Sequence, residues 1–168
     1  GLLLAIQAVA HDVAAVVVDH PHQVDAVHSL QLEGEDVDLY QEKDTGLYHL
    51  LTGKKRDAGE PPTIKRLYSK NLLDWEEVEE PFIVTEPRHA VNICPHLFEW
   101  KGWFYFFGGF TEGSGVWKSK KQFGPWILQK PEKLDLLAVP KTADYPGDRR
   151  IFAGFLEDHG WGGNLVFR

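Results

Sequence analysis

Histidines and carboxylates, the side-chain types that bind divalent metal ions, crowd the N-terminal part of the chain. They are His11, Asp12, Asp19, His20, His22, Asp25 and His28. Apart from the local pair of His20 and His22, their spacing forms no helical i, i+4 ligand pair, and Pro21 breaks any helix between them. The pattern therefore favours a solvated polar linker, and metal binding is the minor alternative.

A thiol and an aromatic ring are two further candidates for chemistry. Cys94 is the single cysteine, which excludes an internal disulfide and a zinc site built from several thiolates. A cysteine nucleophile needs an activated thiolate, which His96 two residues later does not by itself indicate, so we expect Cys94 to be a small buried group. Trp161 stands in the glycine-rich run 160–163, which suits stacking of its ring on a sugar; packing at a strand end explains it equally well.

Three repeats of one pattern predict the elements that position these residues. In each repeat two apolar, often aromatic runs flank a polar turn, and the turns contain Gly46, Gly102 and Gly147. Glycine supplies the positive φ of tight turns, so each repeat predicts an antiparallel hairpin. Repetition about every 50 residues is typical of propeller blades. We predict an all-β fold of about three blades, with units at 34–81, 82–131 and 132–168.

The composition changes near Glu33. Residues 1–32 contain no lysine, arginine or aromatic residue, and Leu2, Ile6, Val9 and Val13 keep helical spacing. We therefore predict an irregular or helical N-terminal segment, with a helix over 2–18. The chain then divides into a segment of uncertain origin, 1–32, and a β domain, 33–168.

Length and charge limit the possible partners. The 168 residues are 43% hydrophobic, which is enough to bury the core of one domain. A net charge of −7 argues against a nucleic-acid partner, and His11 and Asp12 within the first apolar run argue against a membrane span. The lack of methionine and the start at Gly1 lead us to expect a piece of a longer protein, whose open sheet edges would invite self-association.

Four motifs follow one another along the β domain. They are Asp36-Val-Asp-Leu-Tyr40, Ile93-Cys-Pro-His-Leu-Phe98, Ala138-Val-Pro-Lys-Thr142 and Gly147-Asp-Arg-Arg-Ile151. In order and spacing, this set over residues 34–168 resembles glycoside hydrolase family 32, the β-fructofuranosidases. These are five-bladed β-propeller enzymes that include invertases, levanases and inulinases, so the resemblance implies a partial five-bladed propeller.

The resemblance implies cleavage of sucrose or fructan-type glycosidic bonds by two carboxyl groups, without a cofactor or metal. Such retaining hydrolysis needs the two groups about 5–5.5 Å apart. Asp36 matches the family's transition-state-stabilising aspartate, whereas Ile93, which cannot transfer a proton, stands at the acid/base position. The Asn-Asp-Pro context of the family's nucleophile does not occur in this chain. Glu86 is a candidate substitute acid, although an exposed loop glutamate is the simpler interpretation.

Three residues are expected to bind the sugar: Asn92, His96 and Trp161. His96 stands where the family commonly has an acidic residue, and it either donates to a sugar hydroxyl or ends a strand. The resemblance also favours a secreted or periplasmic location, while the residues themselves leave the compartment unknown.

Two functions follow from these expectations. The first is a glycoside hydrolase that resembles β-fructofuranosidases. As a fragment, this chain can be inactive. The alternative is a non-catalytic carbohydrate-binding propeller, which Ile93 favours because it removes the acid. Sugar binding without turnover would separate the two.

Overall fold

The computed structural model of the chain describes residues 3–9, 12–18, 26–30, 36–53, 63–85, 93–110, 113–131, 138–155 and 165–167. Within these residues every regular element is a strand, and the strands form four antiparallel sheets. The predicted all-β fold class is confirmed. No helix in the described part of the chain is long and apolar enough to cross a membrane.

Each sheet is a meander, in which strands that follow one another in the chain pair with one another. The first sheet contains β1 (Leu3–Val9), β2 (Asp12–Val18) and β3 (Ala26–Leu30). The second contains β4 (Val37–Gln41), β5 (Tyr48–Gly53), β6 (Ile64–Ser69) and β7 (Glu76–Ile83). The third contains β8 (Ile93–Trp100), β9 (Trp103–Phe110), β10 (Gly113–Ser119) and β11 (Ile127–Leu128). The fourth contains β12 (Ala138–Tyr145), β13 (Arg149–Phe155) and β14 (Leu165–Phe167).

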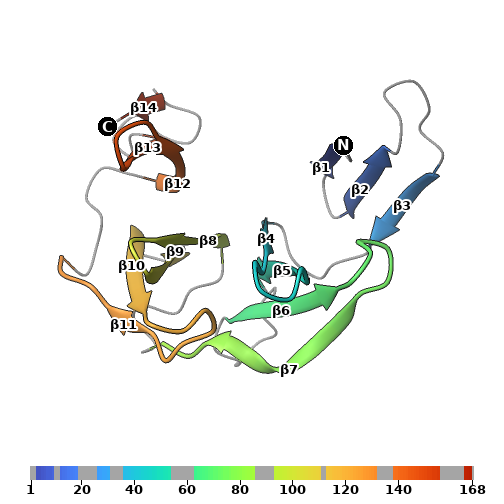
Figure 1. The fold of residues 1–168 in the computed structure, drawn as a ribbon, viewed down its shortest axis with the longest axis horizontal. Coiled ribbons are helices and arrows are strands. Elements are labelled where there is room, and N and C mark those ends of the chain that lie inside the picture. Colours follow the sequence, from blue (N-terminus) through green and yellow to red (C-terminus); the bar gives the residue numbers. More distant parts are fainter. Residues whose placement is uncertain are drawn as a thin grey trace.

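The four sheets stand side by side around an arc, like blades of a propeller (Figure 1). Strands β4, β8 and β12, the first of their sheets, lie toward the inner side of the arc, and β7 and β11 lie on its outer side. The second, third and fourth sheets correspond to the predicted units 34–81, 82–131 and 132–168, although β7 extends to Ile83. The three turn glycines have the expected positive φ, which is 71° at Gly46, 69° at Gly102 and 81° at Gly147.

The predicted N-terminal helix over 2–18 is wrong. Residues 3–9 and 12–18 form β1 and β2, which pair in register from Leu3 with Val18 to Val9 with Asp12, and β3 extends the sheet. β-Branched valines have strand propensity, and in this segment pairing between strands outweighs the helical spacing of the apolar residues. The arc therefore holds four sheets where about three blades were predicted.

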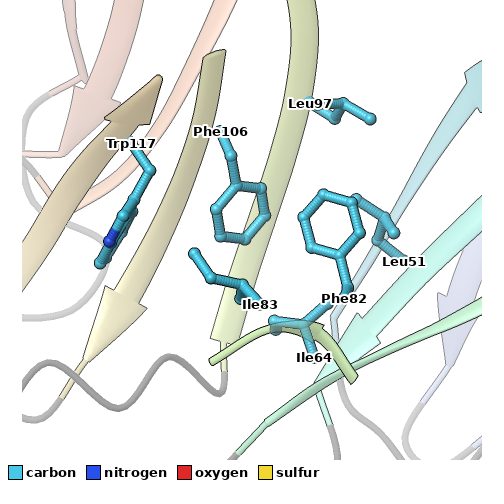
Figure 2. Packing of buried hydrophobic residues seen from close by; sticks show 7 residues of the cluster. All are labelled: Leu51, Ile64, Phe82, Ile83, Leu97, Phe106 and Trp117. Carbon is cyan, nitrogen blue, oxygen red and sulfur yellow. The ribbon is translucent and has the colours of Figure 1, made fainter. Parts of the chain in front are cut away.

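The hydrophobic core lies between the second and third sheets (Figure 2). Buried side chains of both sheets pack face to face, and the Phe82 and Phe106 rings meet edge to face with centroids 5.0 Å apart. The members of this core are Leu51, Ile64, Phe82, Ile83, Leu97, Phe106 and Trp117. Each fully buried large apolar side chain contributes about 1.5–3 kcal/mol, so this cluster fixes how the two blades sit against each other.

Carboxylates line the outer edge of the second sheet. Strand β7 is the last strand of that sheet, and its exposed residues include Glu76, Glu77, Glu79 and Glu80. Charged side chains on an edge strand oppose the addition of another strand. Self-association through open edges stays a prediction, and the glutamates of β7 oppose it at this edge.

Candidate functional site

The same bulge interrupts two of the inner strands. The register of β8 against β9 shifts between Ile93 and His96, and that of β12 against β13 shifts between Ala138 and Lys141. The bulged residues are Cys94-Pro95 and Val139-Pro140; Cys94 and Val139 have φ of 52° and 53°, and both prolines are fully buried. A bulge re-aims the side chain that follows it.

His96 and Lys141 directly follow the two bulges, and Asp38 of β4 lies next to them. His96 of β8 pairs with Phe107, Lys141 of β12 pairs with Ala153, and Asp38 of β4 pairs with Leu51. In each case the partner strand is the second strand of the sheet. The repeated architecture thus brings one carboxylate, one imidazole and one ammonium group to the same level of three neighbouring blades.

These three side chains contact one another. Asp38 Oδ1 lies 3.2 Å from His96 Nδ1 and also accepts a hydrogen bond of 3.2 Å from Lys141 Nζ. The other oxygen of Asp38 accepts a 2.7 Å bond from the backbone N–H of Leu97. The side chains of Asp38 and His96 are 14% and 13% exposed, while that of Lys141 is 41% exposed. Three sheets are therefore joined by one largely buried carboxylate.

Neighbouring side chains also cap the free edge of β8. This strand is an edge strand of its sheet, so part of its backbone has no partner strand. Asp36 accepts from the N–H of Cys94 at 3.1 Å, and Lys141 donates to the carbonyl of Pro95 at 2.6 Å. Backbone groups turned away from water need such partners. Asp36, Asp38 and Lys141 thus have a structural role whatever else they do.

Hydrogen bonds determine the tautomer of His96. Its Nε2 lies 3.1 Å from the backbone N of Thr142, and because an amide N–H can donate but not accept, Nε2 must be the acceptor. The ring proton of the neutral imidazole is then on Nδ1, where it is donated to Asp38. Both ring nitrogens of His96 are therefore occupied within the protein.

A carboxylate, an imidazole and a hydroxyl follow one another in this network, the order found in nucleophilic hydrolases. Thr142 Oγ1 lies 3.2 Å from His96 Nε2 and completes the series that starts at Asp38. However, the same oxygen accepts bonds from Nε and an Nη of Arg150, at 3.1 and 2.9 Å. Its two lone pairs are thereby used, so the geometry favours a structural hydroxyl over a nucleophile.

The thiol of Cys94 is buried and inactive. Cys94 is 5% exposed, as predicted, and its Sγ lies 3.3 Å from Asp36 Oδ2, to which the thiol donates. Burial, and next the negative charge of Asp36, raises the pKa of Cys94 to about 12. A thiol with this pKa is neutral at physiological pH and is no candidate nucleophile. We call Asp36, Asp38, Cys94, His96, Lys141, Thr142 and Arg150 the inner cluster.

Two of the predicted site residues lie in the inner cluster. Asp36 lies directly before β4 and His96 lies on β8, and Ile93, which the resemblance predicts at the acid/base position, directly precedes Cys94, the residue that Asp36 binds. Three others, Glu86, Asn92 and Trp161, lie outside the described residues. Their roles, and that of His96 in sugar binding, stay predictions.

The sequence-based site did not include Asp38, Lys141 or Thr142. A usable signal was present, because Pro95-His96 and Pro140-Lys141 repeat a proline followed by a polar residue in corresponding motifs. No group of three histidine, cysteine or carboxylate side chains in the described part of the chain could hold a metal ion. Of the N-terminal metal-ligand candidates, Asp12 and His28 lie on strands β2 and β3, and the others fall outside the described residues.

Comparison with solved structures identifies the fold. A mutant of the GH43 protein BlXynB from Bacillus licheniformis matches with a TM-score of 0.61 and 14% identity, over 85% of this chain and 30% of that one. Fructan 1-exohydrolase IIa from Cichorium intybus matches with a TM-score of 0.56 and 14% identity, over 91% and 37%. The Bombyx mori GH32 β-fructofuranosidase BmSUC1 matches with a TM-score of 0.55 and 15% identity, over 97% and 46%. The chain shares the β-propeller fold of these structures.

The likeness extends to the fold and no further. The chain spans between about a third and a half of the length of these enzymes, and its identity to each is low. No family model and no curated protein matches the sequence. The propeller glycosidases that match include members of different families, so the specific resemblance to family 32 is not established by them.

Proposed function

We propose that this chain is part of a glycosidase-type propeller that binds a sucrose- or fructan-like saccharide at the inner cluster and does not hydrolyse it. Asp36 would bind the sugar hydroxyls. The chemistry at position 93 separates binding from hydrolysis, because a carboxylic acid is needed there to protonate the leaving oxygen.

The observation that carries the proposal is the contact between Asp36 and Cys94. Asp36 accepts from the N–H and from the thiol of Cys94, the residue that follows Ile93 in the chain. This contact supports the proposal, because the residue matched to the stabilising aspartate then binds the residue next to the position matched to the acid. The position matched to the acid is isoleucine, which cannot protonate a leaving oxygen, whereas the carboxylate of Asp36 can bind hydroxyl groups.

Hydrolysis is the second candidate, and one observation favours it. Asp36 keeps the position and the carboxylate that the resemblance assigns to transition-state stabilisation, and the solved structures with this fold include enzymes described as a fructan exohydrolase and a β-fructofuranosidase. Such an activity would need a substitute acid, for which Glu86 is the candidate. It would also need a nucleophile that the resemblance places in an Asn-Asp-Pro context.

The test combines binding and turnover measurements on the full protein. Calorimetric titration with sucrose and 1-kestose is expected to give saturable binding, and chromatography of the same mixtures is expected to show no released monosaccharide. Asp36→Asn should weaken binding, since it removes the charged acceptor. Asp148→Asn is the control, because Asp148 lies outside the inner cluster, in the turn between β12 and β13, where it is exposed and paired with Lys101.

The outcomes separate the candidates. Release of fructose by the wild type, lost in Asp36→Asn and in Glu86→Gln, would establish hydrolysis and overturn the binding proposal. Absence of binding to either sugar would overturn both. If the wild type binds without turnover, hydrolysis by Ile93→Glu would show that the acid at position 93 is what hydrolysis lacks.

A further inference from the structure

We propose that Lys141 is a ligand-binding residue of the inner cluster, and that with Asp36 it holds two neighbouring hydroxyl groups of a neutral saccharide. This inference rests on the proposed function. It adds a binding residue and a charge class for the ligand.

Hydrogen bonds hold the ammonium group of Lys141 in place without using all three of its N–H donors. Its Nζ donates to the carbonyl of Pro95 at 2.6 Å and to Asp38 Oδ1 at 3.2 Å. An ammonium group has three N–H donors, so one remains after these two bonds. The side chain is 41% exposed, against 14% for Asp38. Lys141 therefore offers a pre-positioned donor at a site that solvent or a ligand can reach.

Asp36 offers the matching acceptor. Its Oδ2 accepts from the backbone and the thiol of Cys94, while its Oδ1 has no hydrogen-bond partner among the residues that the structure describes. Asp36 and Lys141 bind consecutive residues of β8, Cys94 and Pro95, whose Cα atoms are about 3.8 Å apart across a trans peptide. A single sugar ring can span two groups anchored this closely.

The charge balance of the cluster selects a neutral ligand. Asp36 and Asp38 carry negative charge against the positive charge of Lys141, His96 is held as the neutral tautomer, and Arg150 is ion-paired with Asp144. One net negative charge remains, which repels uronic acids and sulfated sugars. Two adjacent hydroxyl groups, one donating to Asp36 and one accepting from Lys141, satisfy both side chains without adding charge.

The experiment compares two lysine variants of the full protein by calorimetric titration with 1-kestose. Lys141→Met keeps the length of the side chain and removes its donors. Lys43→Met is the control, since Lys43 is also paired with one carboxylate, Glu99, at 2.7 Å, but on the exposed surface. Loss of a hydrogen bond to a charged group is expected to raise the dissociation constant about tenfold or more in Lys141→Met and to leave Lys43→Met unchanged.

Two further measurements distinguish ligand binding from a structural effect. Lys141→Met leaves Asp38 without its cation, so the double variant Asp38→Asn/Lys141→Met restores the charge balance and should show the same weakened binding. Deoxy analogues of 1-kestose, each lacking one hydroxyl, extend the comparison. The analogue that lacks the hydroxyl bound by Lys141 should bind the wild type more weakly, and Lys141→Met should not weaken its binding further. D-glucuronate should not compete with 1-kestose.

Each failure has a separate meaning. If the wild type binds 1-kestose and both Lys141 variants bind it equally well, the role of Lys141 is refuted and the proposed function stands. Competition by D-glucuronate at equal strength would refute the charge class. If the wild type binds no neutral saccharide at all, the proposed function fails and this inference fails with it.

Discussion

Two histidines with different hydrogen-bond partners, His49 and His96, should respond in opposite ways to the same substitution. His49 of β5 is 3% exposed, and neither ring nitrogen has a hydrogen-bond partner in the described part of the chain. Its nearest charged group, Glu42 Oε2, is 3.6 Å from Nε2, which is beyond hydrogen-bond distance. In His96 both nitrogens are bonded. We predict that His49→Leu stabilises the protein and that His96→Leu destabilises it.

The magnitudes follow from these partners. An unsatisfied buried polar group costs about 1–3 kcal/mol. His49→Leu removes this cost but also loses the edge-to-face contact of His49 with Phe123, at 4.8 Å between centroids, worth about 0.5–1.5 kcal/mol. We expect a net gain of about 1 kcal/mol in the free energy of unfolding. His96→Leu breaks a bond to a carboxylate and one to a backbone amide, which together cost about 2–4 kcal/mol.

The stabilisation by His49→Leu should depend on pH. Burial, and next the positive charge of Arg66, lowers the pKa of His49 below 6.5, and Glu42 partly opposes the shift. Below pH 6.5 the unfolded state therefore binds the proton that the folded state refuses, so wild-type stability falls as the pH falls. The slope is at most about 1.4 kcal/mol per pH unit until the folded pKa is reached. The variant lacks this group, so its advantage should grow below pH 6.5.

Urea unfolding of the wild type and both variants at pH 5, 6, 7 and 8, followed by tryptophan fluorescence, measures these differences. The free energies of unfolding show whether each substitution stabilises or destabilises the protein. Their change with pH shows how the contribution of His49 depends on pH. Destabilisation by His49→Leu at every pH would show that its nitrogens have partners, and the reasoning would then be refuted. A gain in stability that does not change with pH would support the cost of the unsatisfied polar group but would refute the lowered pKa of His49.

Two further predictions concern Cys94 and the core. Burial and Asp36 raise the pKa of Cys94 to about 12. The thiol should therefore resist a thiol reagent at pH 8 in the folded protein and react at once in urea. Rapid labelling without denaturant would contradict this prediction. Phe106, fully buried between the second and third sheets, should cost about 3–5 kcal/mol when replaced by alanine, as measured by urea unfolding, and a loss below 1 kcal/mol would show that the two blades do not pack through it.

The hairpins and blade boundaries could be predicted because their signals are local. Gly46, Gly102 and Gly147 each mark a turn in which positive φ is required, and the apolar runs on either side pair with each other. The N-terminal segment misled the prediction because its apolar residues are also spaced like one face of a helix. The strand pattern prevails because β2 also pairs with β3. The spacing of residues within 2–18 carries no information about that pairing.

The candidate site could be predicted only in part, for a related reason. Asp36 and His96 belong to motifs that carry the family resemblance, and each could be chosen from its own neighbourhood in the sequence. Lys141 gains its role from Asp38, which is 103 residues away in the chain. Such a contact exists because the first strands of successive sheets converge on the inner side of the arc. The pattern of one blade cannot reveal it.

The inner cluster shows how a propeller can keep its scaffold while changing its chemistry. Three first strands converge, and the free edge of β8 needs partners for its backbone whether or not the protein acts on a sugar. Asp38 is fully committed to this task, since both its oxygens are bonded, whereas Asp36 commits one oxygen and Lys141 two of three donors. On the proposed function, isoleucine at position 93 stands in place of an acid, and the structural bonds of Asp36, Asp38 and Lys141 are kept. Loss of catalysis therefore need not weaken the fold, and the groups that remain uncommitted are those suited to holding a sugar.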